Sequence, residues 1–179
     1  NMICPNNTVA ACATVDQAGN ESQVMRLISE IEILERMIIM SKKRVLGVIG
    51  LGHVGAHVAY SLAVQGIADE LILVDKNEQK VASEVQDLRD AAAYLPHRVT
   101  VRAGSFADLG ACDVIVNSVG KIELLRETHD RLTEMDFTIP AVRSYAGEIK
   151  KSGFDGVLIN ITNPCDIVTR ELALGIGLP

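Results

Sequence analysis

Three glycines, Gly50, Gly52 and Gly55, have the spacing G-x-G-x-x-G, between an apolar run at 45–49 and a helical pattern. In such a turn Gly50 allows a tight bend, Gly52 lets the backbone approach a pyrophosphate, and Gly55 lets the helix pack on the strand. The backbone N–H groups of the first helical turn, together with the helix dipole, attract phosphate groups. The residues of this turn predicted to bind the cofactor are Gly50, Leu51, Gly52, His53, Val54 and Gly55.

An acidic residue, Asp75, closes the next apolar run at 71–74. A carboxylate in this place accepts hydrogen bonds from a ribose diol and repels a 2′-phosphate, so the pattern favours NAD over NADP. Glycines alone recur by chance, and an ordinary strand-to-helix turn is the alternative interpretation. The strand before the turn, the helix after it and the acid together favour a dinucleotide site.

Polar residues also follow two later apolar runs. Ser118 and Gly120 come after the run at 113–117, where they would leave room beside the nicotinamide ribose. Asn163 comes after the run at 157–161 and offers both a donor and an acceptor, while Pro164 fixes the direction of the next helix. Asn163 could instead be a helix N-cap, but together with the glycine turn and Asp75 a functional role is favoured.

The elements that must position these residues alternate between strand and helix. The predicted strands are 44–49, 71–75, 99–101, 113–117 and 157–161. The predicted helices are 53–66, 77–93 with Asn77 as N-cap, 133–152 with a kink or break at Pro140, and one that begins at Pro164. This order predicts an α/β fold with a Rossmann-type doubly wound parallel sheet, whose ligand binds at the carboxyl ends of the strands.

Residues 1–40 differ from the rest. Apolar residues recur at helical spacing over 21–40, which predicts an amphipathic helix in an N-terminal extension. The dinucleotide-binding domain is expected at 41–179. The extension is interpreted as an oligomerisation arm or as sequence outside the ancestral frame.

Composition narrows the class of protein. The 179 residues carry a net charge of −6, so no basic face for nucleic acid is expected. No apolar run reaches the roughly 18 residues that span a bilayer. The four cysteines have no C-x-x-C spacing, and Cys112 and Cys165 are predicted to be buried reduced thiols. A cytoplasmic protein without a metal site is expected.

The motifs together resemble the lactate/malate dehydrogenase family, most closely its L-2-hydroxyisocaproate dehydrogenase branch. The resemblance covers about residues 41–179 and rests on the glycine turn, Asp75, Ser118-Val119-Gly120, Asp130-Arg131-Leu132 and Thr162-Asn163-Pro164-Cys165-Asp166. It implies hydride transfer between NADH and the carbonyl of a 2-oxo acid, in a homo-oligomer (dimer or tetramer). Arg131 matches the mobile-loop arginine that polarises the carbonyl, and Asn163 matches the asparagine that positions substrate and nicotinamide.

The match covers only the cofactor-binding half of such an enzyme. The family's catalytic histidine, its aspartate partner and its carboxylate-binding arginine would follow the last residue, and no histidine present lies in the required motif. Those present are His53, His57, His97 and His129. The sixth strand would also be missing, which would leave strand 157–161 as an open edge. The natural polypeptide is therefore expected to continue, and this chain alone is expected to be inactive.

Residues 121–126 bear on the substrate. Ile122 and Leu125 suit an apolar side chain, which favours a branched substrate such as 2-oxoisocaproate, or else lactate and pyruvate. Arg126 could pair with a second carboxylate, which would indicate a malate dehydrogenase. Two hypotheses from other classes are an NAD-sensing regulatory domain without catalysis and an inactive dimerisation module built around 21–40.

Overall fold

The computed structural model describes residues 42–121 and 131–178 of the chain. Residues Lys43–Pro179 form one compact unit. The helix predicted at 21–40 lies outside the described residues, so it remains a prediction.

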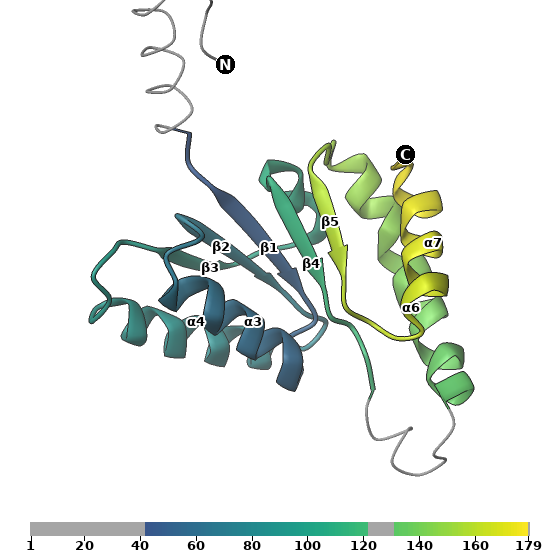
Figure 1. The fold of residues 1–179 in the computed structure, drawn as a ribbon, viewed down its shortest axis with the longest axis horizontal. Coiled ribbons are helices and arrows are strands. Elements are labelled where there is room, and N and C mark those ends of the chain that lie inside the picture. Colours follow the sequence, from purple (N-terminus) through teal and green to yellow (C-terminus); the bar gives the residue numbers. More distant parts are fainter. Residues whose placement is uncertain (1–41, 122–130, 179) are drawn as a thin grey trace, which may run out of the picture. The chain divides into compact units, whose positions relative to one another are not determined.

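Strands and helices alternate along this unit, as the sequence predicts (Figure 1). The strands are β1 (Val45–Ile49), β2 (Glu70–Val74), β3 (Thr100–Ala103), β4 (Val114–Asn117) and β5 (Val157–Asn160). The helices are α3 (His53–Val64), α4 (Glu78–Ala92), the 3-10 helix η1 (Phe106–Ala111), α6 (Arg131–Lys151) and α7 (Cys165–Ile176). Asn77 caps α4 as predicted, because its side chain accepts a hydrogen bond from the Lys80 N–H at 3.1 Å.

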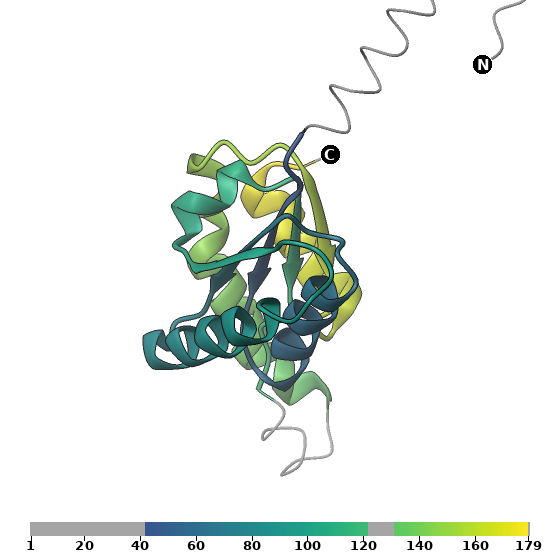
Figure 2. The same ribbon diagram turned by 90° about the vertical axis from the view of Figure 1, so that its left-hand side faces the viewer.

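The five strands form one parallel sheet in the order β3-β2-β1-β4-β5. This arrangement confirms the predicted Rossmann-type sheet. Because all strands run the same way, their carboxyl ends meet at one edge, the lower edge in Figures 1 and 2. The polar residues that follow β1, β2, β4 and β5 are thereby gathered at that edge.

Helices cover the two faces of the sheet in separate layers (Figure 1). On one face α3 and α4 enclose an aliphatic core that includes Val48, Leu71 and Leu73, each 0 % exposed. On the other face η1, α6 and α7 enclose a second core around Ile72, Ile115 and others. Alternate residues of each strand point to opposite faces, so the four buried residues of β1 (46–49) and of β2 (71–74) are all apolar or glycine.

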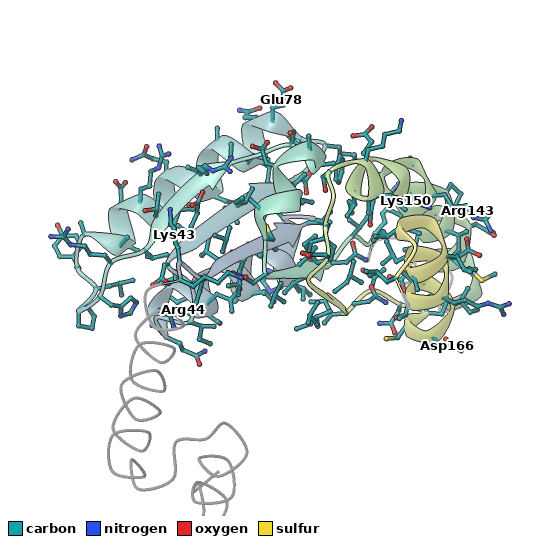
Figure 3. All side chains as sticks on the ribbon, turned by 90° about the horizontal axis from the view of Figure 1, so that it is seen from above. Lys43, Arg44, Glu78, Arg143, Lys150 and Asp166 are labelled. Atoms are coloured by element: carbon teal, nitrogen blue, oxygen red, sulfur yellow. The ribbon has the colours of Figure 1, made fainter. Side chains whose placement is uncertain are left out.

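The helices α6 and α7 pack closely on each other. A Cβ atom placed on Gly175 would lie 2.6 Å from the Cβ of Ala146, so only glycine permits this approach. At the exposed margin, Arg143 Nε donates to Glu171 Oε2 at 2.6 Å. Figure 3 shows Arg143 and Lys150 beside α7, at the end of the unit opposite to Lys43 and Arg44.

Two details differ from the prediction. The 3-10 helix η1 was not predicted, because its six residues are too few to show a helical period. It begins where the Asp108 carboxylate accepts from the Ser105 N–H at 2.8 Å and the Ser105 hydroxyl at 2.6 Å. Of the kink or break predicted at Pro140, the break is wrong, because α6 runs through Pro140 as one helix. Proline removes one backbone hydrogen bond from the helix, and because Pro140 is exposed, this gap lies on the solvent side.

Strand β5 lies at an edge of the sheet, as predicted, and no strand of the described residues pairs with its outer side. Its apolar side chains on the α3 face are uncovered: Val157 is 60 % exposed and Ile159 46 %. Leu158, which points to the opposite face, packs against the core beneath α6 and α7. The sheet is therefore closed on one face of β5 and open on the other.

Burial predicts how much each apolar side chain contributes to stability. Ile149 in α6 is 0 % exposed, so Ile149→Ala should lower the free energy of unfolding by about 2–5 kcal/mol. Leu174 in α7 is 69 % exposed, so the control Leu174→Ala should change it by less than about 0.5 kcal/mol. Urea unfolding followed by circular dichroism measures both, and equal losses would contradict the described packing.

Candidate dinucleotide-binding site

Two of the three glycines are required by close packing. Gly50 has a φ of +84°, and a Cβ on it would lie 2.9 Å from the Val119 backbone nitrogen. A Cβ on Gly55 would lie 1.8 Å from the Gly50 carbonyl oxygen and 2.5 Å from Ser118 Oγ. Because both residues lack a Cβ, α3 can pack directly against the ends of β1 and β4.

Gly52 differs, because a Cβ there would meet no atom within 4 Å and would project into open space. It is the N-cap of α3, and no acidic residue lies in the first turn of that helix. The amides of Gly52, His53, Val54 and Gly55 find no acceptor among the described residues. This cradle of four N–H groups with an open approach is what phosphate binding at a helix N-terminus requires, and the binding itself stays a prediction.

Leu51 takes no part in that cradle through its side chain, which is 0 % exposed. Its N–H donates to Asp75 Oδ2 at 2.6 Å, so the amide is occupied as well. The Asp75 carboxylate also accepts from the Asn77 N–H at 2.9 Å, and it follows β2 directly, since the strand ends at Val74. Each carboxylate oxygen keeps a second lone pair for a ligand hydroxyl.

Ser118 fixes the glycine turn from the side of β4. Its hydroxyl donates to the carbonyl oxygens of Ile49 at 2.9 Å and Gly50 at 2.7 Å. That proton is therefore shared within the protein, and only the acceptor capacity of the oxygen remains for a ligand. The predicted contact of Ser118 with cofactor remains a prediction.

Gly120 is exposed, and a Cβ on it would lie 3.6 Å from Glu134 Oε1. Glu134, in the first turn of α6, is only 7 % exposed, and its Oε2 atom has no hydrogen-bond partner among the described residues. Glu134 was not among the predicted site residues, although an acid at a position of α6 that the helical period places inside could have indicated a ligand contact. A buried carboxylate oxygen without a partner is costly unless a ligand supplies a donor.

Asn163 follows β5, and its side chain is exposed without a hydrogen bond to any described residue. The N-cap of α7 is Pro164, so the alternative interpretation of Asn163 as a capping residue is wrong. The backbone oxygen of Asn163 accepts from Thr138 Oγ1 at 3.4 Å, which joins this turn to α6. The carboxamide is thus presented at the carboxyl edge with its donors and acceptor free.

The other predicted residues are placed as follows. Arg131 is the first residue of α6, whereas Ile122, Leu125, Arg126 and His129 lie outside the described residues. His57 Nδ1 lies 2.7 Å from the His53 oxygen, and His97 Nε2 lies 2.6 Å from the Ala63 oxygen. Within residues 42–121, the rings of His57 and His97 thus contact backbone oxygens of the protein itself.

The two cysteines in the described residues differ in environment. Cys112 is buried as predicted, and burial raises the pKa of its thiol to about 12. Cys165, predicted to be buried, is exposed, because it is the first residue of α7 and faces outward at the end of β5. No group of three or more histidine, cysteine or acidic side chains in residues 42–121 and 131–178 could hold a metal ion. Within those same ranges no helix is long and apolar enough to cross a membrane.

The sequence that forms this site matches a known protein family. Residues 44–175 match the family model described as lactate/malate dehydrogenase, NAD binding domain. The chain is 40 % identical over 137 residues to the L-lactate dehydrogenase of Fusobacterium nucleatum, covering 75 % of this chain and 42 % of that protein. It is 37 % identical to the L-lactate dehydrogenase of Bacillus velezensis, covering 75 % and 42 %. The chain therefore spans less than half the length of these relatives.

Solved structures agree with the sequence relatives. The minor L-lactate dehydrogenase of Enterococcus mundtii, in a ligand-bound form, superposes with a TM-score of 0.71 at 31 % identity, covering 76 % of this chain and 43 % of that one. The lactate dehydrogenase of Cryptosporidium parvum, complexed with lactic acid and nicotinamide adenine dinucleotide, gives 0.70 at 25 % identity, covering 77 % and 43 %.

The glycine turn predicts a contrast between two alanine variants. Gly55→Ala should lower the free energy of unfolding by about 3 kcal/mol or more, because its Cβ would overlap the Gly50 carbonyl. Gly147→Ala in α6, where a Cβ meets nothing within 4 Å, should raise it by about 0.5–1 kcal/mol. Urea unfolding of both variants tests this, and a Gly55→Ala protein as stable as the wild type would refute the packing of the turn.

Proposed function

The chain belongs to the lactate/malate dehydrogenase family, and from that premise we propose that it is the NAD-binding portion of an NAD-dependent L-2-hydroxyacid dehydrogenase. The reaction is hydride transfer between NADH and the carbonyl carbon of a 2-oxo acid. The observation that carries this proposal is the open cradle at Gly52, with four unpaired amides at the start of α3 and Asp75 beside it. The chain covers 42–44 % of the length of these relatives, so we propose the full reaction only for an enzyme that also contains a catalytic half.

The residues present fit a dinucleotide. The amides at the start of α3 would hold the pyrophosphate, and the absence of an acid in that turn leaves their positive potential uncompensated. Asp75 would accept from the adenosine ribose hydroxyls. Glu134, whose Oε1 faces Gly120 and whose Oε2 has no partner among the described residues, would accept from a donor at the nicotinamide end. The last contact would remove the cost of a buried, unpaired carboxylate oxygen.

The same edge of the sheet supports a substrate-binding role for two residues. The free carboxamide of Asn163 can donate to a carbonyl oxygen and accept from the nicotinamide amide. Arg131, at the start of α6, would stabilise negative charge on the carbonyl oxygen as the hydride transfers. NADH supplies the hydride when bound. We assign the proton to none of His53, His57 and His97, because His53 lies in the turn proposed to hold phosphate and the rings of His57 and His97 contact backbone oxygens.

We infer a 2-oxo acid with one carboxylate and an apolar side chain, which Ile122 and Leu125 would contact. The family relatives bear the name L-lactate dehydrogenase, which supports a monocarboxylic substrate and gives no support to malate. A branched substrate such as 2-oxoisocaproate is the finer proposal and rests on those two side chains alone. An NAD sensor without chemistry would need neither Asn163 nor Arg131.

Cofactor binding by this chain tests the proposal directly. NADH should bind at least about tenfold more tightly than NADPH, because the Asp75 carboxylate repels a 2′-phosphate. Gly52→Ala should keep the wild-type stability but weaken NADH binding about tenfold, because its Cβ fills the cradle. Gly147→Ala is the matched control and should bind normally. Titration calorimetry measures all of these, and a wild type that binds neither nucleotide would overturn the proposal.

Substrate choice is tested in the natural protein that contains this chain. Arg126→Gln should leave reduction of pyruvate and 2-oxoisocaproate within about twofold of wild type, because a monocarboxylic acid has no second carboxylate to pair with it. Steady-state kcat/KM values for these acids and for oxaloacetate provide the measurement. A large loss confined to oxaloacetate would restore the malate interpretation.

A further inference from the structure

Two asparagines face each other across neighbouring strands at the carboxyl edge. Asn117 at the end of β4 and Asn160 at the end of β5 are register partners. Asn117 is 0 % exposed, although the other three residues of β4 are apolar. A carboxamide buried so deeply must satisfy its donors and acceptor within the protein.

The backbone N–H of Thr162 determines which atom of each carboxamide is the oxygen and which is the nitrogen. The Thr162 N–H can only donate, and it lies 3.2 Å from Asn160 Oδ1, which is therefore the oxygen. Asn117 Nδ2 must then be the donor to Asn160 Oδ1 at 2.9 Å. The remaining Asn117 atom is the acceptor, and the Tyr145 hydroxyl donates to it at 2.7 Å. Burial raises the pKa of Tyr145, which keeps this hydroxyl protonated.

The network encloses the turn that carries Asn163. Asn117 Nδ2 also donates to Thr162 Oγ1 at 3.1 Å, immediately before Asn163. Asn160 Nδ2 lies within hydrogen-bond distance of the Thr162 oxygen at 3.3 Å and of the Cys165 oxygen at 3.2 Å. Hydrogen bonds therefore fix the chain at Thr162 and Cys165, on both sides of Asn163. The Asn163 side chain itself is exposed and has no hydrogen bond to a described residue.

The same carboxamide reaches a third element through Tyr145. This residue lies in α6, which begins at Arg131, and Thr138 of the same helix contacts the Asn163 backbone oxygen. The two residues proposed to contact substrate and nicotinamide are therefore on segments that share one buried side chain. Valine or leucine would fill the same space in a parallel sheet at lower desolvation cost, so packing alone does not explain the polar choice.

We propose that Asn117 is a positioning residue that holds the Asn163 carboxamide, and through Tyr145 helix α6, in the geometry required at the nicotinamide end of the site. This inference rests on the proposed function. It predicts that loss of the network damages recognition of the nicotinamide half of the cofactor and spares the adenosine diphosphate half, which we propose binds at the start of α3 and at Asp75 after β2.

The test compares two ligands on this chain, NADH and ADP-ribose, which lacks only the nicotinamide. Asn117→Leu should weaken NADH binding about tenfold and change ADP-ribose binding less than about twofold. Tyr145→Phe removes one hydroxyl and should give the same pattern with a smaller loss, so it carries the test if Asn117→Leu does not fold. Calorimetry gives both affinities, and thermal unfolding gives the stability of each variant.

Two controls separate positioning from general damage. Val142→Ala removes a side chain that is 0 % exposed in α6 without touching the network, so it should destabilise the fold but leave the ratio of the two affinities unchanged. Asn163→Ala should reproduce the selective loss, and adding Asn117→Leu to it should produce no further loss of NADH affinity.

The outcomes distinguish this inference from the proposed function. A wild type that binds both ligands, together with an Asn117→Leu variant whose two affinities fall equally or not at all, overturns the positioning role alone. A wild type that binds neither ligand overturns the proposed function, and the positioning role with it. Selective loss in Asn117→Leu but not in Asn163→Ala overturns the assignment of Asn163 as the residue being positioned.

Discussion

The contact on which the site depends is the approach of α3 to the ends of β1 and β4, where Gly55 lies against the Gly50 carbonyl. A Cβ on Gly55 would lie 1.8 Å from that oxygen, so no other residue allows the helix to begin there. The Ser118 hydroxyl and the Asp75 carboxylate hold the turn from the two neighbouring strands. The amides of residues 52–55, at the start of the helix, find no acceptor among the described residues. The proposed binding of phosphate to them is a consequence of this packing.

The parallel sheet explains why residues distant in the sequence form one site. Parallel register places the residues after β1, β2, β4 and β5 at one edge, so that spacing along the chain becomes proximity in space. Alternating apolar runs and helical periods were enough to predict the sheet, its helices and this edge. The glycine roles and the cap at Asn77 were also predictable, because they depend on local backbone geometry.

Features that depend on long-range contacts could not be predicted from the sequence. The pairing of Asn117 with Asn160 needs the register of two strands 43 residues apart, and Tyr145 joins them only once α6 has packed. In the sequence Glu134 does not differ in type from an exposed helix acid, and only the fold shows that it is buried beside Gly120. Cys165 followed an apolar run and was expected inside, but it begins a helix and faces solvent. The 3-10 helix η1 is too short for any periodic signal.

The two halves of the edge differ in a way that matches two tasks. Around β1, α3 and β2 the functional groups are backbone amides and an acid fixed by backbone bonds, which suit a ligand that must bind the same way every time. Around β4, β5 and α6 they are side chains held by other side chains, with the free Asn163 carboxamide at the end of a buried polar chain. A polar network satisfied in one arrangement favours that arrangement over others. Binding energy would thus come from the first half, and the orientation of the reacting groups from the second.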